Sequence, residues 1–198
     1  MEKQTIIFMG RSGCGKGTQV ELLMEYMRAH DAEKREIFHL ETGATFREFI
    51  ESGSYSSKLS KDIYMSGKLQ PSFLAVHIWS HVFIENLKGD EHIILDGTPR
   101  TLAETPVLDT AFQFYGRTKP KVIVLDVSNE WSTERLKGRG RFDEKNPEDV
   151  KKRLEWFDTD VVPAIRYMEA AKLYEVHRIN GEQSIEKVHD DIIKALFG

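Results

Sequence analysis

The segment whose residues point most directly to chemistry is a glycine-rich stretch that follows a short apolar run. The sequence Ile-Ile-Phe-Met over 6–9 leads into Gly-Arg-Ser-Gly-Cys-Gly-Lys-Gly-Thr over 10–18. Glycines let backbone N–H groups surround phosphate oxygens, and the positive end of a following helix attracts the same anion. Lys16 would reach the distal phosphates and the Thr18 hydroxyl would lie near a magnesium ion, although Gly17 separates two residues that the general pattern has adjacent. We therefore predict a phosphate-binding loop rather than a turn without a ligand.

Two later segments bring further phosphate and metal ligands. Thr-Gly-Ala-Thr-Phe-Arg ends at Arg47, one helical turn from a predicted helix start, where a guanidinium can bind a phosphate through two N–H groups. Asp-Gly-Thr-Pro-Arg begins at Asp96, directly after an apolar run, and ends at Arg100. A carboxylate that faces a phosphate loop from a strand end can hold magnesium or its waters, which we favour over a role as a turn or cap residue.

Arginines separated by glycines form a third feature. Arg139 and Arg141 flank one glycine, and this spacing predicts a loop rather than one face of a helix. Lys151, Lys152 and Arg153 also fit an ordinary solvated helix face. Together, two phosphate-facing loops, a metal-facing carboxylate and several arginines are what phosphoryl transfer needs, because its transition state spreads negative charge over the moving group.

Length and composition indicate one ordinary globular domain. The chain has 198 residues, 40% of them hydrophobic, and a formal net charge of −4, which argues against general nucleic-acid binding. Cys14 is the single cysteine, so neither an intrachain disulfide nor a cysteine-rich zinc site is expected. No apolar run is long enough to cross a membrane, and the first residues lead into a strand pattern rather than a signal peptide. We expect a cytoplasmic protein that contacts no membrane.

The elements that must position these loops alternate along the chain. Predicted strands are 5–9, 37–40, 92–95, 121–127 and 174–179. Predicted helices are 16–29, 45–52, 56–66, 71–88, 102–115, 128–137, 147–171 and 185–196, the seventh interrupted at Pro163. Continuous apolar runs indicate strands covered on both faces, so the pattern predicts a three-layer α/β fold: a five-stranded parallel sheet with helices on both faces. Residues 42–88 hold several predicted helices and no strand, which indicates a helical insertion above the sheet.

The chain resembles the adenylate kinase family of nucleoside monophosphate kinases, which have the P-loop NTPase fold. The matching motifs are Gly-Cys-Gly-Lys-Gly-Thr-Gln at 13–19, Thr-Gly with Arg47, Ser-Gly-Lys-Leu at 66–69, Asp-Gly-Thr-Pro-Arg-Thr at 96–101, Arg139 with Arg141, Lys-Lys-Arg-Leu at 151–154 and Asn-Gly at 180–181. They occur in family order over nearly the whole chain. The resemblance implies a single domain with a CORE at 1–41, 72–138 and 147–198, an NMP-binding helical region at 42–71 and a shortened LID at 139–146.

The resemblance also implies the roles of individual residues. ATP would be bound by Gly13, Cys14, Gly15, Lys16, Gly17, Thr18, Arg139 and Gln183. The monophosphate would be bound by Thr42, Arg47, Lys68, Leu69, Gln70, Gly97, Thr98, Pro99, Arg100, Glu104, Arg141 and Arg153. The catalytic set would be Lys16, Arg100, Arg139, Arg141 and Arg153, with Asp96 orienting Mg²⁺ through water. The implied activity is reversible transfer, ATP + AMP = 2 ADP, with Mg²⁺ and without a structural zinc ion.

The sequence departs from the family pattern at four places. The LID is reduced to a short segment, Ala44 replaces an Asp, Thr98 replaces an aromatic residue, and Glu104 replaces the Gln that reads the adenine of AMP. An ionised Glu only accepts hydrogen bonds, so it suits guanine N–H groups or the cytosine amino group as well as adenine. AMP is the favoured acceptor; the alternatives are a CMP/UMP or GMP kinase and a catalytically weak nucleotide-binding protein. The family default is a monomer, and the short LID leaves room for an oligomer.

Overall fold

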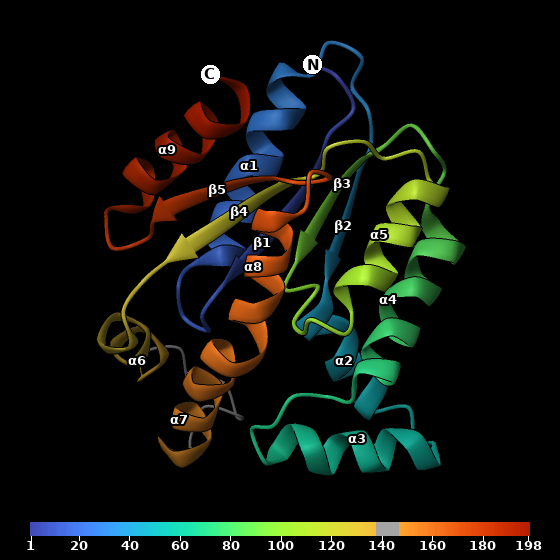
Figure 1. Ribbon diagram of the computed structural model, residues 1–198, viewed down its shortest axis with the longest axis vertical. Coiled ribbons are helices and arrows are strands. Elements are labelled where there is room, and N and C mark those ends of the chain that lie inside the picture. The colour runs from blue at the N-terminus through green and yellow to red at the C-terminus, as the bar shows by residue number, and fades with distance from the viewer. Residues whose placement is uncertain (138–146) are drawn as a thin grey trace.

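The computed structural model describes residues 1–137 and 147–198, and its centre is a parallel sheet (Figure 1). The strands are β1 (Thr5–Gly10), β2 (Ile37–Glu41), β3 (His92–Asp96), β4 (Lys121–Asp126) and β5 (Glu175–Asn180). Their order in the sheet is β2-β3-β1-β4-β5, and every neighbouring pair is parallel. The predicted five-stranded parallel sheet is therefore confirmed, with strand ends shifted by a residue or so.

Helices connect the strands in the predicted alternation. They are α1 (Lys16–His30), α2 (Thr42–Ile50), α3 (Tyr55–Met65), α4 (Ser72–Asn86), α5 (Thr105–Phe114), α6 (Asn129–Lys137), α7 (Pro147–Trp156), α8 (Val162–Ala170) and α9 (Ile185–Phe197). A π-helical turn, Phe157–Val161, separates α7 from α8 immediately before Pro163. Proline has no N–H to donate to the carbonyl four residues back, which explains why the predicted interruption of a long helix occurs here.

Two apolar layers cover the two faces of the sheet. Residues alternate along β1, so Ile7 packs against α4, α5 and α8, whereas Phe8 packs against α1 and α9. Both side chains have no exposed surface. This is the reason that the strands are continuous apolar runs, and Figure 1 shows the two helical layers on either side of the arrows. The three-layer α/β prediction is confirmed.

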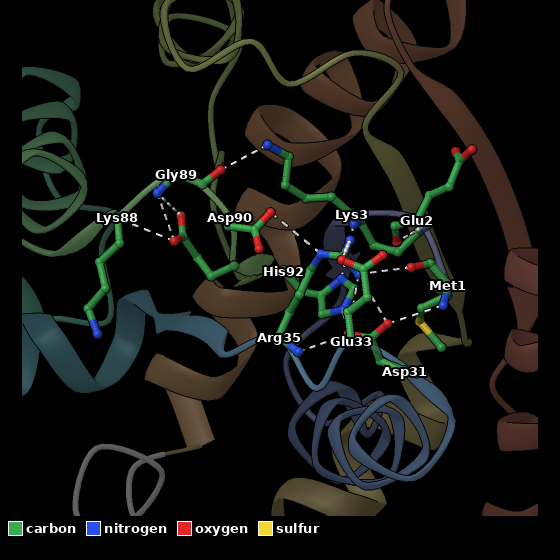
Figure 2. A network of polar contacts seen from close by, with 12 residues as sticks. Met1, Glu2, Lys3, Asp31, Glu33, Arg35, Lys88, Gly89, Asp90 and His92 are labelled. Carbon is green, nitrogen blue, oxygen red and sulfur yellow. Dashed lines mark hydrogen bonds and ion pairs between the residues drawn. The ribbon is translucent and has the colours of Figure 1, made fainter.

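A polar network closes the end of the sheet where the strands begin (Figure 2). The Gln4 N–H donates to His92 Nδ1 at 3.0 Å, so His92 Nε2 carries the proton and donates to Asp31 Oδ2 at 3.3 Å. Asp31 also accepts from the backbone N–H of Arg35 at 2.9 Å and from its guanidinium at 3.1 Å. The hydrogen bond from the backbone N–H of Arg35 is the main reason that the pKa of Asp31 lies far below its usual range. Burial lowers the pKa of His92.

The opposite end of the sheet, where the strands finish, carries the loops that the sequence singled out. Residues 42–71 contain α2 and α3 and no strand, and α3 lies beyond the carboxyl ends of the strands in Figure 1. Phe46 packs with Leu74 and Ile78, which fixes α2 to α4. Among the helices of the described residues, none is long and apolar enough to cross a bilayer.

Candidate active site

A cleft of about 1180 Å³ opens at the carboxyl ends of the strands. Ligands in open α/β sheets bind at this edge, because the connecting loops meet there. The phosphate-binding loop lines one side, and the loop after β3 lines the cleft floor together with α2. α6 and α7 also contribute side chains. Predicted site residues that line the cleft are Gly13, Gly15, Lys16, Gly17, Thr18, Arg47, Lys68, Leu69, Gln70, Asp96, Gly97, Pro99, Arg100 and Arg153.

The phosphate-binding loop has the backbone shape that its glycines allow. Gly15 precedes α1 with φ of 97°, a left-handed conformation that favours glycine. A Cβ at Gly10 would lie 2.8 Å from the Leu125 carbonyl oxygen, so a larger residue would push β1 away from β4. Lys16 curls over the loop, and its Nζ donates to the carbonyl oxygens of Gly10 at 2.8 Å and Arg11 at 3.1 Å. The ammonium thus stands over the ring of backbone N–H groups, where it can exchange these carbonyls for phosphate oxygens.

Two guanidinium groups, from α2 and from the loop after β3, line the same cleft. Arg47 Nη2 donates to Glu41 Oε1 at 2.9 Å, and Arg100 Nε donates to the Gly97 carbonyl at 3.0 Å. Burial lowers the pKa of Arg47, but its hydrogen bonds to Glu41 and Tyr64 outweigh that effect and the pKa is raised. Burial lowers the pKa of Arg100, which marks it as a cation largely removed from water and poised to bind an anion.

Asp96 and Thr18 supply the oxygen ligands that suit magnesium. Both side chains belong to residues that line the cleft, Asp96 at the end of β3 and Thr18 in the first turn of α1. Within 1–137 and 147–198, no group of three or more His, Cys, Asp and Glu side chains is arranged to hold a metal ion. Magnesium commonly binds through one or two protein oxygens, water and substrate phosphates, so the donor set fits a nucleotide-bound ion.

Glu104 lies in the protein interior, beside the loop that carries Arg100. The residue is 2% exposed and is not among the described residues that line the cleft. Its Oε1 accepts from the N–H groups of Arg100 at 3.2 Å and Thr101 at 3.1 Å, and from the Thr101 hydroxyl at 3.0 Å. Burial raises the pKa of the Glu104 carboxyl, against the opposing Thr101 hydrogen bond and Arg100 charge. Glu104 therefore holds the loop that carries Arg100, and its contact with the acceptor base stays a prediction.

Four other predicted residues also lie outside the part of the cleft lining that the structure describes. Cys14 is buried under the phosphate-binding loop, with Sγ 3.6 Å from Lys16 Nζ. The hydroxyls of Thr42 and Thr98 hydrogen-bond to each other in the protein interior, which ties α2 to the loop after β3. Gln183 Nε2 donates to the Asn180 carbonyl at 2.9 Å and to Asp191 at 3.0 Å, so it turns toward α9 rather than the cleft. These residues shape the loops around the cleft.

The predicted LID, 139–146, lies outside the described residues, and so do its arginines Arg139 and Arg141. The expectations for them stay predictions. On the described side of this segment, Trp131 and Arg135 of α6 line the cleft, and the Arg135 guanidinium lies 4.9 Å from the Trp131 ring centroid. This pair forms one wall next to the phosphate-binding loop.

Several residues that line the cleft were missed by sequence reasoning, among them Glu41, Tyr64 and Trp156. Glu41 is the last residue of β2, Tyr64 belongs to α3, and Trp156 is the last residue of α7. Trp156 Nε1 donates to the Gly67 carbonyl at 3.2 Å, and its ring lies 6.0 Å from the Arg100 guanidinium carbon. The position of Glu41 at the end of a predicted strand could have identified it as a cleft residue. Whether Tyr64 and Trp156 reach the cleft depends on which side of its helix each residue occupies, and the sequence contains no direct sign of that.

The fold and the cleft define a class: a P-loop protein in which a glycine-rich loop and several arginines line one cleft. A model of the adenylate kinase family matches residues 8–173. An adenylate kinase from Bacteroides fragilis is 33% identical over 195 residues, covering 96% of this chain and 97% of that protein. One from Prochlorococcus marinus is 32% identical over 190 residues, with 96% and 97% covered.

A relative with a different name matches equally broadly. UMP-CMP kinase 3 from Arabidopsis thaliana is 32% identical over 200 residues, covering 99% of this chain and 90% of that protein. The match of the family model over most of the chain decides the assignment. The chain belongs to the adenylate kinase family and is a kinase of the nucleoside monophosphate kinase class.

Proposed function

We propose that the protein transfers a phosphoryl group between ATP and AMP, ATP + AMP = 2 ADP, with Mg²⁺ bound to the nucleotide. One observation carries the proposal: cations from three separate segments line the same cleft. Lys16 lies at the phosphate-binding loop, Arg47 on α2 and Arg100 on the loop after β3. A protein that only binds ATP needs the first group alone, whereas a reaction between two nucleotides needs a phosphate site on each side.

The cleft residues would act by position and charge. Lys16 would leave the carbonyls of its own loop and bind the phosphoryl group in transfer, while Arg47 and Arg100 hold the acceptor phosphate. Arg153 is close enough to Arg100 that its charge helps to lower the pKa of that guanidinium, so both would bear on one developing negative charge. Magnesium bound at Asp96 and Thr18 would neutralise charge on the donor phosphates.

The reaction needs no general base among these residues. The acceptor oxygen belongs to an ionised phosphate, so it carries no proton to remove. A bond forms between this oxygen and the γ-phosphorus of ATP, and the bond from that phosphorus to the bridging oxygen of the β-phosphate breaks. Charge stabilisation and alignment then account for catalysis, which agrees with a cleft rich in lysine and arginine.

A second acceptor class has a specific observation in its favour. The Arabidopsis relative is named a UMP-CMP kinase, and its identity to this chain is close to that of the adenylate kinases. The Glu104 carboxylate, on which the alternative of a GMP acceptor depends, is hydrogen-bonded to its own loop in the free protein. CMP or UMP is therefore the competing acceptor, and a weakly active nucleotide-binding protein is disfavoured because Lys16, Arg47 and Arg100 all line the cleft.

The test is a comparison of kcat/KM for AMP, CMP, UMP and GMP, with MgATP as the donor. AMP should be preferred by about tenfold or more, the discrimination that a few pocket contacts provide. An equal or greater kcat/KM for CMP or UMP would reassign the acceptor. No transfer to any of the four would refute the kinase activity.

A further inference from the structure

Glu41 places a carboxylate on an arginine of the proposed acceptor site. It is the last residue of β2 and lies beside Asp96 in the register of β2 and β3. Its Oε1 accepts from Arg47 Nη2 at 2.9 Å. The Arg47 side chain is 30% exposed and that of Glu41 is 39% exposed, so the pair lies at the surface of the cleft, where a ligand can replace one partner.

The pair lies where the second arginine also reaches. A Cβ at Gly43 would lie 3.3 Å from Arg47 Nη1, 3.7 Å from Arg100 Nη2 and 3.8 Å from Glu41 Oε1. Both guanidinium groups and the carboxylate oxygen therefore surround one small volume above the Gly43 backbone. All four residues line the same cleft.

A carboxylate and a phosphate compete for a guanidinium in the same way. Each group has oxygens that accept hydrogen bonds from the guanidinium N–H groups, and each is attracted by the positive charge of the guanidinium. Glu41 and a phosphate cannot both hold Arg47 without bringing two negative groups together, and like charges at such distances repel. Binding of a phosphate on Arg47 and Arg100 therefore requires that Glu41 moves away.

We propose that Glu41 occupies the acceptor-phosphate position of the free protein and must be displaced by the incoming phosphate. This inference rests on the proposed function, because it assigns Arg47 and Arg100 to the acceptor. Glu41 then weakens the binding of every monophosphate by the same factor, whatever its base. It also shields the acceptor side from weakly binding anions while the site is empty.

The test measures acceptor binding by calorimetry without ATP, for the wild type and for Glu41→Gln. The amide has no charge, so AMP and CMP should each bind about twofold to fivefold more tightly, the range for an ion pair at the surface of a cleft. Adenosine has no phosphate, so its dissociation constant should not change. ATP, held by the phosphate-binding loop, should also bind unchanged.

Further variants separate the proposed role from general effects. Glu51→Gln removes a carboxylate from an exposed pair with Lys61 in the same helical region, 2.9 Å apart, and should leave the AMP affinity unchanged. Glu41→Ser removes the carboxylate by a different side chain and should reproduce the gain, which keeps the test decisive if the amide variant does not fold. Glu41→Asp keeps the charge and should gain less than either.

Three results would overturn the inference, and they distinguish a failure of the inference from a failure of the proposed function. Equal or weaker AMP binding by both Glu41→Gln and Glu41→Ser refutes it and leaves the proposed function standing. Unchanged AMP affinity with a lower kcat and a higher Mg²⁺ requirement would assign Glu41 to the metal beside Asp96 instead. Absence of monophosphate binding by the wild type would refute the proposed function, and the inference with it.

Discussion

Arg11, in the phosphate-binding loop, is tied to the segment that follows α7. Its guanidinium donates to both carboxylate oxygens of Asp158, at 2.9 and 2.6 Å, and to the Leu154 carbonyl at 3.3 Å. The guanidinium carbon lies 4.5 Å from the centroid of the Phe157 ring. This tether joins the donor loop to the helix that carries Arg153, and we expect it to stabilise the fold measurably.

The geometry sets the size of the effect. The Arg11 side chain is 16% exposed and that of Asp158 is 49% exposed, so solvent screens the pair in part. Its two parallel hydrogen bonds place it near the upper end for exposed pairs, about 1 kcal/mol of coupling. Arg11→Ala also loses the contact with the Phe157 ring, roughly 0.5–1 kcal/mol more. For a chain of this size, 1 kcal/mol corresponds to a change in Tm of about 2–4 °C.

The assay is a double-mutant cycle on the free energy of unfolding in urea, with Arg11→Ala, Asp158→Ala and the double variant. We expect a coupling of about 1 kcal/mol that decreases at high salt. The exposed pair Lys61–Glu51, 2.9 Å apart with side chains 47% and 67% exposed, is the matched control and should couple by less than about 0.5 kcal/mol. Additivity within about 0.3 kcal/mol for Arg11 and Asp158 would refute the tether.

Three other predictions concern the base, the pH and the cleft wall. Glu104→Gln should change the ratio of kcat/KM for AMP to that for CMP by less than about twofold, because the loss of a direct contact with the base usually changes this ratio by more. A larger change would indicate that Glu104 contacts the acceptor base. The low pKa of folded Asp31 gives stability that is present above its ordinary pKa and lost as the pH falls, and the lowered pKa of His92 adds a loss below about pH 6.5. The wild-type Tm should therefore fall from about pH 4 to about pH 2 more steeply than that of Asp31→Asn, and parallel curves over this range would contradict the role of Asp31. Trp156→Phe removes the hydrogen bond to Gly67, about 1 kcal/mol, and should lower the Tm by about 2–4 °C. We also expect AMP binding to change the tryptophan emission of the wild type and not that of this variant. An emission change that persists in the variant would come from another tryptophan.

Patterns that depend on the backbone could be predicted from the sequence. The continuous apolar runs predicted strands covered on both faces, and β1 sends Ile7 to one layer and Phe8 to the other. Because parallel strands end at one edge, the predicted loops after β1, β2 and β3 meet in one cleft. The prediction that the loop at 10–18 binds phosphate rests on the same kind of local rule, since glycine content and a helix start belong to the sequence itself.

The direction of individual side chains could not be predicted with the same certainty. Glu104 was assigned from its motif position, yet the spacing Thr101-Leu-Ala-Glu104 is also a capping box, in which the Glu returns to the backbone N–H of the Thr. That local signal was present and favoured the observed contact. The pairing of Glu41 with Arg47 had no such signal, because it depends on the angle at which α2 leaves β2. The side-chain direction of Trp156 depends in the same way on where α7 ends, and a π-helical turn begins directly after it.

The measurement that tests phosphoryl transfer across this cleft most directly is the formation of labelled ADP from γ-labelled ATP and AMP, by the wild type and by Lys16→Met. The wild type should transfer the label, and the variant should fold with an unchanged Tm and lose about a hundredfold or more in kcat, as expected when a preorganised charge at the reacting group is removed. Lys61→Met, outside the cleft lining that the structure describes, should retain full activity. Activity of Lys16→Met within about tenfold of the wild type would contradict the role of the phosphate-binding loop in the transfer.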